Sequence, residues 1–178
     1  MRVRTIAVAV GAAVVGVVVL VSLTRSTSGG VEFSGDLRAG GELESLSLPR
    51  LAGEGSIDYA GLDDRPLVIN FFASWCPNCI AEMPDFERVH VSLGDRVEFL
   101  GISQSDAEQA SIDLVHETGI TYDAGIDRDG AFFTGLGVVG MPTTVFVRPG
   151  GEIAEVWQGG LDATTLEQLI GEHLGVTG

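Results

Sequence analysis

The residues best suited to chemistry in this sequence are its two cysteines, Cys76 and Cys79, which are separated by two residues. Such a pair can cycle between a dithiol and a small disulfide ring, or supply half of a zinc site. A structural zinc site needs four ligands, but the sequence has no other cysteine, and its three histidines, His90, His116 and His173, are scattered without the spacing of ligands. An inert disulfide over so short a loop would stabilise the fold only weakly. We therefore predict a redox pair, with a metal site and an inert disulfide as alternatives.

The flanking residues predict that the pair lies where a strand passes into a helix. Residues 66–72 are a short apolar run of the kind found in buried strands, and residues 80–89 carry apolar side chains every third position, as on one helix face. Pro77 falls near the first helical position, where a missing N–H costs nothing. The N–H groups and dipole at this helix end favour a thiolate at Cys76, and Cys79 lies one turn further in.

Two separate motifs carry a family resemblance. Residues 75–79, Trp-Cys-Pro-Asn-Cys, resemble the active site of the thioredoxin superfamily. Residues 68–86 are similar to membrane-anchored thiol–disulfide oxidoreductases of the TlpA, ResA and CcmG type. The second motif is Gly-Met-Pro-Thr-Thr-Val-Phe-Val at residues 140–147. The resemblance extends from about residue 43 to residue 174 and implies a thioredoxin-like α/β fold, with a mixed sheet flanked by helices and an N-terminal β-hairpin extension.

The resemblance also assigns roles around the sulfurs. It implies that Pro142 follows a cis peptide bond from Met141 and lies against the cysteines, limiting access and shaping the groove for a partner's chain. Trp75 is expected to cover one side of the first cysteine. Pro77 and Asn78 are expected to tune the reduction potential. The alternative for the flanking side chains is simple packing, and we expect neither a cofactor nor a metal.

The proton acceptor for Cys79 is not evident from the sequence. Thioredoxin has a buried aspartate six residues before its first cysteine that assists proton transfer to the second, whereas Asn70 stands there in this chain and cannot take up a proton. TlpA-like relatives often lack the acid too. Glu82, three residues beyond Cys79, is a candidate general base. We favour the alternative that it is a solvated residue on the helix surface.

The N-terminal segment has the composition of a membrane span. Residues 5–23 carry no charge and are long enough to cross a bilayer as a helix, and the arginines within residues 1–4 favour a cytoplasmic N-terminus. We predict a single-pass signal anchor rather than a cleaved signal peptide, because the run is long and no clear cleavage site follows. Residues 24–41 predict a flexible tether, and residues 42–178 one extracytoplasmic thioredoxin-like domain, in a compartment that tolerates disulfides.

After the N-terminal extension, the sequence predicts the element order β-α-β-α-β-α-β-β-α. The elements expected after the first helix are a strand at 96–103, a helix at 106–118 capped by Asp106 and stopped by Gly119, a strand at 120–126, a helix at 129–136, a hairpin of 143–148 with 152–158, and a final helix to about residue 174 capped by Asp162 or a residue just before it.

The charge balance is strongly acidic, with 10 basic and 25 acidic residues and a net charge of −15. This excess of carboxylates argues against a nucleic-acid partner and against docking on anionic lipid. We interpret it as a solvated surface that keeps the domain soluble.

The predicted activity is that of a protein-disulfide oxidoreductase, in which Cys76 attacks a partner's disulfide and Cys79 displaces the reduced partner. The resemblance implies reduction of exported proteins, with apocytochrome c or a metalloprotein's cysteines as expected substrates and a membrane electron-transfer partner of the thiol–disulfide type. A disulfide-forming oxidase of the same fold is the main alternative. A peroxiredoxin-like peroxidase would need Thr or Ser where Ala73 stands, and a copper chaperone would need a histidine near the pair. An adaptor that merely keeps a disulfide is the last alternative.

Overall fold

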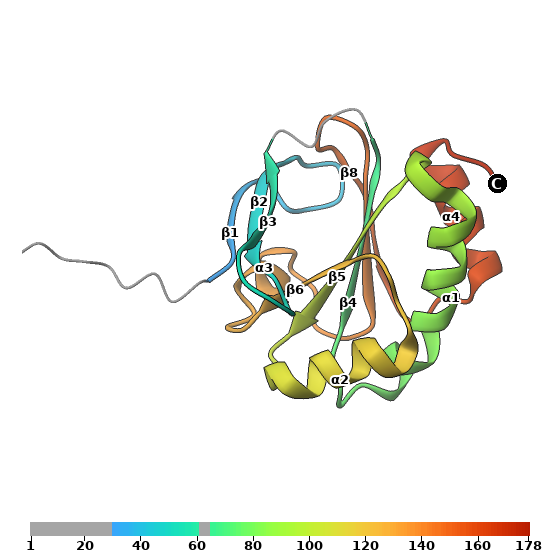
Figure 1. The fold of residues 1–178 in the computed structure, drawn as a ribbon. Helices are drawn as coiled ribbons and strands as arrows, with labels where there is room; N and C mark the ends of the chain where they lie inside the picture. Colours follow the sequence, from blue (N-terminus) through green and yellow to red (C-terminus); the bar gives the residue numbers. More distant parts are fainter. Residues whose placement is uncertain (1–29, 61–64) are drawn as a thin grey trace, which may run out of the picture.

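The structure is a computed structural model that describes residues 30–60 and 65–178. At its centre is a five-stranded sheet in the order β6-β5-β4-β7-β8. Helices α1, α2 and α4 cover one face, and a second sheet, of the strands β1, β2 and β3, lies with α3 over the other (Figure 1). The bounds of the elements in chain order are β1 Glu32–Gly35, β2 Leu43–Pro49, β3 Ser56–Ala60, β4 Leu67–Phe72, α1 Pro77–Leu93, β5 Glu98–Gln104, α2 Glu108–Thr118, β6 Asp123–Asp127, α3 Ala131–Gly135, β7 Thr143–Val147, β8 Ile153–Gln158 and α4 Ala163–Leu174.

The central sheet is mixed, as the sequence predicts. Strand β4 runs parallel to β5 and antiparallel to β7, while β5 is parallel to β6 and β7 is antiparallel to β8. All six residues of β4 are buried, because the strand lies in the middle of the sheet with both faces covered. The register pairs Phe71 with Thr143, so the carboxyl end of β4 lies beside the start of β7 at one end of the sheet.

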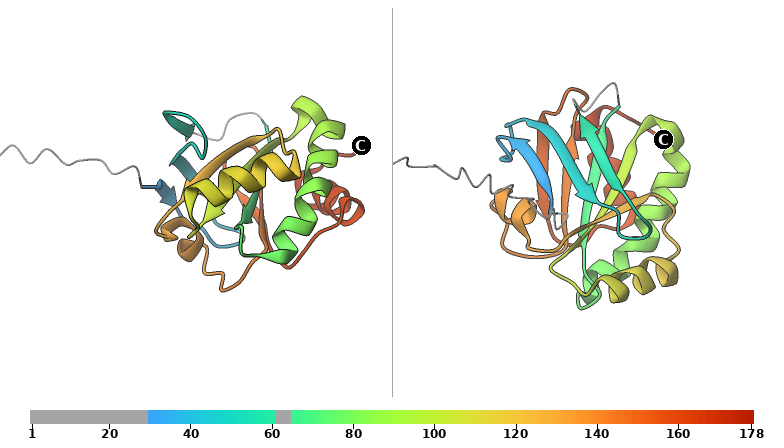
Figure 2. Two further views of the ribbon diagram at one scale, coloured as in Figure 1. Left: turned by 60° about the horizontal axis from the view of Figure 1, so that its bottom comes forward. Right: turned by 60° about the vertical axis from the view of Figure 1, so that its left-hand side comes forward.

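The N-terminal extension differs from the prediction. It is a three-stranded antiparallel sheet and not a two-stranded hairpin, and its first strand, β1, falls within the segment 24–41 that the sequence assigns to a flexible tether (Figure 2). The tether prediction is therefore wrong for β1. Strand β1 is held by packing far along the chain, since the ring of Phe33 lies 5.2 Å from that of Phe132 on α3. A contact between residues so distant in sequence leaves no periodic pattern around β1.

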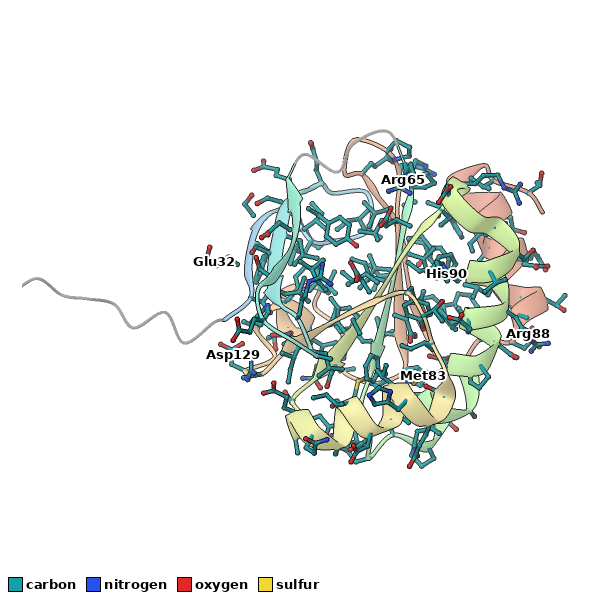
Figure 3. The ribbon with its side chains drawn as sticks, viewed as in Figure 1. Glu32, Arg65, Met83, Arg88, His90 and Asp129 are labelled. Carbon is teal, nitrogen blue, oxygen red and sulfur yellow. A yellow bond between two sulfur atoms is a disulfide. The ribbon has the colours of Figure 1, made fainter. Side chains whose placement is uncertain are left out.

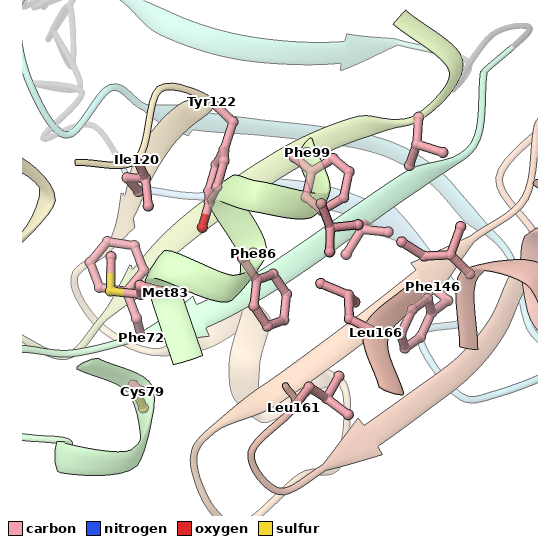
Figure 4. Close-up of a cluster of buried hydrophobic side chains, with 14 of the residues drawn as sticks. Phe72, Cys79, Met83, Phe86, Phe99, Ile120, Tyr122, Phe146, Leu161 and Leu166 are labelled. Carbon is pink, nitrogen blue, oxygen red and sulfur yellow. The ribbon is translucent and has the colours of Figure 1, made fainter. Parts of the chain in front are cut away.

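Two apolar clusters fill the space on the two faces of the central sheet. The larger one joins α1, α2 and α4 to the sheet and includes both cysteines together with Met83, Phe86 and Leu161 (Figure 4). Met83 points from α1 into the protein, whereas Arg88 on the same helix projects outward (Figure 3). The cysteine pair is thus built into the edge of the main core.

The predicted order of elements after β3 is confirmed. The residues that begin and end the helices can also be compared with the predicted ones. Gly119 ends α2 in the left-handed conformation, and the Asp162 side chain caps α4 by accepting a hydrogen bond from the N–H of Thr165 at 2.8 Å; both were expected. The prediction that Asp106 is the N-cap of α2 is wrong. The cap position is Ala107, because the carboxylate of Asp106 turns instead toward the segment before the cysteines.

The predicted signal anchor at residues 5–23 and the cytoplasmic segment 1–4 lie outside the described residues. Within residues 30–60 and 65–178, no helix has the length and apolar character needed to span a membrane.

Candidate active site

Cys76 and Cys79 form a disulfide at the point where β4 passes into α1. Their Cα atoms are 5.3 Å apart. Cys76 is the N-cap residue of α1, with Pro77 beside it at the start of the helix, and its sulfur accepts a hydrogen bond from the backbone N–H of Cys79 at 3.2 Å. The predicted position of the pair at a helix N-terminus is therefore what the structure has. A thiolate formed at Cys76 would face unpaired N–H groups and the positive end of the helix dipole.

The two sulfurs differ in their access to solvent. Cys76 keeps 5% of its surface exposed, whereas Cys79 is completely buried among Met83, Phe86 and the rest of the larger cluster. Cys76 is therefore the more accessible of the two cysteines.

The cis-proline segment lies at the same edge of the sheet as the disulfide. The Met141–Pro142 peptide bond is cis, as the resemblance implies, and Pro142 directly precedes β7, whose first residue pairs with Phe71 on β4. Met141 is half-buried and packs against both apolar clusters. The carbonyl oxygen of Pro142 accepts a hydrogen bond from the N–H of Gly159 at 2.9 Å, which ties this loop to the segment before α4.

Trp75 and Asn78, both expected to support the site, lie on its surface. Trp75 is 59% exposed, which makes it an exposed aromatic residue immediately before the buried sulfur of Cys76. Val139, just ahead of the cis-proline, is 95% exposed. Apolar side chains therefore face solvent both next to Cys76 and on the segment that leads to the cis-proline.

Glu82 occupies a position that the sequence analysis judged wrongly. It is not a solvated residue on the helix surface: it is 4% exposed and shares the buried face of α1 with Cys79. One carboxylate oxygen, Oε1, accepts a hydrogen bond from Nδ2 of Asn70 at 2.8 Å, and the other, Oε2, accepts one from the backbone N–H of Leu161 at 3.0 Å. The helix places Glu82 inward because residues three apart lie on the same face.

The environment of Glu82 suits a group that exchanges protons near neutral pH. Burial raises the pKa of its carboxyl from the ordinary 4.5 to about 7, although the hydrogen bonds from Leu161 and Asn70 act in the opposite direction. Among the described residues, the buried Oδ1 atom of Asn70 has no hydrogen-bond partner. A side-chain amide does not take up a proton near neutral pH, so Asn70 can only position the carboxylate of Glu82 through its Nδ2.

Asp106 is a part of the site that sequence reasoning missed. Its carboxylate accepts hydrogen bonds from the N–H of Ser74 at 2.6 Å and from the hydroxyl of Ser74 at 2.9 Å. It also accepts from the N–H of Ala107 and the hydroxyl of Ser111. Burial alone would raise the pKa of Asp106, but these donors outweigh it and hold the pKa below its usual value. Asp106 thus anchors the turn before Trp75 and Cys76 to the start of α2.

Neither Asn70 nor Asp106 could have been paired with its partner from the sequence, because the partners lie 12 and 32 residues away along the chain. The burial of Glu82 could have been predicted from helical spacing, because Glu82 lies three residues after Cys79 and four before Phe86, which are both buried on α1. For the described part of the chain, no group of three or more His, Cys, Asp or Glu side chains is arranged to hold a metal ion.

Comparison with known families and curated proteins agrees with this geometry. Residues 39–156 match the model of the AhpC/TSA family. The chain is 28% identical over 120 residues to the thiol-disulfide oxidoreductase ResA of Oceanobacillus iheyensis, covering 67% of this chain and 62% of that protein. It is 31% identical over 129 residues to the thiol:disulfide interchange protein DsbE of Escherichia coli, covering 72% and 66%. The matches thus span slightly less than two thirds of these two relatives.

Solved structures show the same fold. A secreted Mycobacterium tuberculosis disulfide oxidoreductase, described as homologous to E. coli DsbE, superposes with a TM-score of 0.62 at 26% identity, covering 73% of this chain and 95% of that one. The predicted resemblance to thioredoxin-like thiol–disulfide oxidoreductases is confirmed by these comparisons.

Proposed function

The chain belongs to the AhpC/TSA family, and from that membership and the geometry of its site we propose that it is an extracytoplasmic thiol–disulfide oxidoreductase that reduces disulfides of exported proteins. The observation that carries the proposal is the asymmetry of the pair. Cys76 sits at the helix N-cap and keeps 5% of its surface exposed, whereas Cys79 is completely buried one turn behind it.

The proposed reaction has two exchange steps. The Cys76 thiolate attacks one sulfur of the partner's disulfide, which forms a mixed disulfide and releases the partner's other sulfur as a thiolate. Cys79 then loses its proton and attacks the sulfur of Cys76, so the mixed disulfide breaks and the second partner thiolate leaves. The protein ends with the Cys76–Cys79 disulfide and the partner with two reduced sulfurs.

The second step needs a base for the buried thiol of Cys79, and we assign that role to Glu82. Its carboxyl lies on the same buried face of α1, and its raised pKa of about 7 lets it accept a proton and release it again near neutral pH. Asn70 positions this carboxylate by donating to Oε1. When the disulfide is reduced again by a donor, protonated Glu82 returns a proton to the leaving thiolate of Cys79.

The remaining supporting residues frame the reaction. Trp75 and the cis-proline segment at Met141 and Pro142 border the groove where the partner's chain lies, and Pro77 and Asn78 tune the reduction potential through the dipoles and hydrogen bonds that reach the sulfurs. The exposure of Trp75 supports this arrangement, because an aromatic face in water next to a reactive sulfur is available for contact with a partner.

The cellular setting of the proposal follows from the N-terminal sequence. Residues 5–23 act as a single-pass membrane anchor with residues 1–4 in the cytoplasm, and the segment up to β1 is the tether that carries the domain outside. The partners are exported proteins, with apocytochrome c or a maturing metalloprotein as substrates, and a membrane electron-transfer protein that recharges the pair. The similarity to ResA, a thiol-disulfide oxidoreductase, and to DsbE, a thiol:disulfide interchange protein, supports the thiol–disulfide chemistry.

A trapping experiment tests the assignment of the two cysteines. A Cys79→Ser variant should accumulate a mixed disulfide between Cys76 and the partner, because the resolving thiol is missing, whereas Cys76→Ser should trap nothing. Non-reducing gels of a membrane preparation followed by mass spectrometry identify the trapped proteins. Recovery of adducts through position 79 in Cys76→Ser, with none through position 76 in Cys79→Ser, would contradict the proposed order of attack.

A further inference from the structure

A small cleft opens beside the buried carboxylate of Glu82. It has a volume of about 250 Å³ and lies between α1 and the segment that leads into α4. Its lining residues are Asn78, Ala81, Glu82, Asp85, Gly160, Leu161 and Asp162. Glu82 lines the cleft but is only 4% exposed, and its Oε2 atom lies close to the backbone of Gly160 in the cleft lining.

Gly160 faces the carboxylate across this cleft. A Cβ atom built at residue 160 would lie 3.7 Å from Oε2 of Glu82, which is an ordinary van der Waals contact. The backbone does not demand glycine there, because Gly160 is not among the residues with a positive φ, whereas the neighbouring Gly159 has a φ of 124°. The backbone conformation at residue 160 thus does not require glycine, but a side chain there would lie against the carboxylate of Glu82.

The segment that carries Gly160 is fixed on both sides. The N–H of Gly159 donates to the carbonyl oxygen of Pro142, and the N–H of Leu161 donates to Oε2 of Glu82. These two hydrogen bonds hold the segment of Gly160 against the carboxylate of Glu82. The oxygen that Leu161 binds is the same one that a side chain at residue 160 would cover.

Proton exchange with water requires such an opening. Cys79 is completely buried and Asn70 is 1% exposed, so the interior side of Glu82 offers no solvent. The other titratable groups near Glu82 are Asp85 and Asp162, which line the cleft, and Tyr122 in the larger apolar cluster. The pKa of Tyr122 is raised by its burial and further by the charges of Glu87 and Glu82. Asp162 has a lowered pKa because Thr165 donates to it, so a charged carboxylate stands at the cleft.

We propose that this cleft is the path by which Glu82 exchanges its proton with solvent, and that the absence of a side chain at residue 160 keeps the path open. The inference rests on the proposed role of Glu82 as the proton acceptor for Cys79. In each cycle Glu82 takes one proton from the Cys79 thiol, exchanges it with water through this path, and is protonated again from water when the donor reduces the disulfide. Gly160 is then a positioning residue for the reaction, acting through Glu82.

The first test measures the Glu82 carboxyl in the full-length disulfide form in detergent, where no thiol chemistry occurs. Glutamate labelled with carbon-13 at the carboxyl reports its pKa by NMR, and Glu82→Gln assigns the resonance. Gly160→Ala and Gly160→Val should raise the pKa of Glu82, by about one unit for Ala, because a methyl group removes water from Oε2. Gly171→Ala on α4 is the matched control, since a Cβ there also meets its nearest atom at 3.7 Å but lies away from the cleft, and it should leave the pKa unchanged.

The second test follows the reaction itself with dithiodipyridine as the disulfide. The reduced protein releases one thiopyridone when Cys76 attacks and a second when Cys79 resolves the mixed disulfide. At pH 7 the second phase should slow about fivefold in Gly160→Ala. With a pKa near 8, roughly a tenth of Glu82 is ionised at this pH, whereas about half is ionised in wild type. The rate should recover above pH 8, where Glu82 is ionised in both proteins. The first phase and the Gly171→Ala control should match wild type.

The two tests separate the inference from the function on which it rests. An unchanged pKa of Glu82 in both Gly160 variants would overturn the solvent path while leaving the acceptor role intact. A raised pKa with an unchanged pH profile of the second phase would overturn the acceptor role, and with it the catalytic purpose of the cleft. A raised pKa with the matching shift of the profile supports both.

Discussion

Two carboxylates lie next to the cysteine pair in the fold, Glu82 on the helix that follows it and Asp106 bound to the turn that precedes it, and they differ in their burial and in their hydrogen-bond donors. Glu82 on α1 is buried and has two hydrogen-bond donors, Asn70 and Leu161. Asp106, between β5 and α2, is half-buried and accepts from Ser74, Ala107 and Ser111. Burial raises both pKa values, but the donors reverse the effect only at Asp106.

The comparison shows how one residue class serves two purposes around the same sulfurs. A carboxylate with many donors and some water stays charged and acts as a fixed anchor, whereas one with few donors and little water changes its protonation near neutral pH. We therefore assign proton transfer to Glu82 and positioning of the Ser74 turn to Asp106.

Removing the base should have the largest effect. Glu82→Gln keeps the shape of the side chain but cannot accept a proton, so the release of the second thiopyridone by Cys79 should slow about a hundredfold at pH 7. Asp106→Asn, which keeps most of its hydrogen bonds, should slow the same phase less than threefold. Equal slowing in the two variants, measured by stopped-flow absorbance, would erase the distinction between them.

Removing the anchor should act on stability. Asp106→Ala leaves the N–H and hydroxyl of Ser74 without their acceptor, and we expect the free energy of unfolding in urea to fall by roughly 2 to 3 kcal/mol. Asp113→Ala is the control on α2, because Asp113 is exposed and accepts only from the Gln109 side chain, and it should cost less than about 0.5 kcal/mol. Similar losses in both variants would show that Asp106 is an ordinary surface residue.

The pH dependence of stability should distinguish the carboxylates again. The folded protein raises the pKa of Glu82 from 4.5 to about 7, so the folded state binds more protons than the unfolded state between these values. This contribution to stability is complete below pH 4.5 and is lost as pH rises through 7. Glu82→Gln has no such loss. Between pH 5 and pH 8, the free energy of unfolding of this variant in the disulfide form should therefore rise by roughly 2 kcal/mol relative to that of wild type.

The lowered pKa of Asp106 has the opposite sign. Its contribution is present above the ordinary value of 3.8 and is lost only as pH falls through its still lower folded value. Asp106→Asn should therefore show a constant difference from wild type between pH 5 and pH 8 in urea titrations. A difference that changes with pH in this window would contradict the assignment of Asp106 as a fixed anion.

The smallest expected effect is that of the hydrogen bond between the strand and the helix. Asn70→Ala removes the donor to Oε1 of Glu82, which favours the protonated acid, so the pKa of Glu82 should rise by about half a unit. The carboxyl resonance of labelled glutamate measures it. A pKa that falls on this substitution would mean that Asn70 does not support the ionised carboxylate.

The sequence predicts the frame of this site better than its chemistry. The strand, the helix N-terminus and the order of the later elements follow from periodicity and from Pro77, because each depends on residues close along the chain. The cis bond before Pro142 came from the resemblance alone. What the sequence could not predict is what depends on packing between distant segments, including the pairing of Asn70 with Glu82.

Two predictions failed for this same physical reason. Glu82 was interpreted as a surface residue because glutamates are mostly exposed, yet the segment around Leu161 covers it from the far end of the domain. Strand β1 was interpreted as part of a tether because its polar composition gives no period, yet Phe33 packs against the ring of Phe132.

The reduction potential of the Cys76–Cys79 pair tests the proposed reductase most directly. The full chain in detergent is equilibrated with glutathione or a thioredoxin of known potential, and the dithiol fraction is measured by alkylation. We predict a value toward the reducing end, near roughly −270 mV, at which the dithiol can reduce the disulfides of exported proteins. A value near roughly −120 mV would contradict the account and identify the protein as an oxidase that installs disulfides.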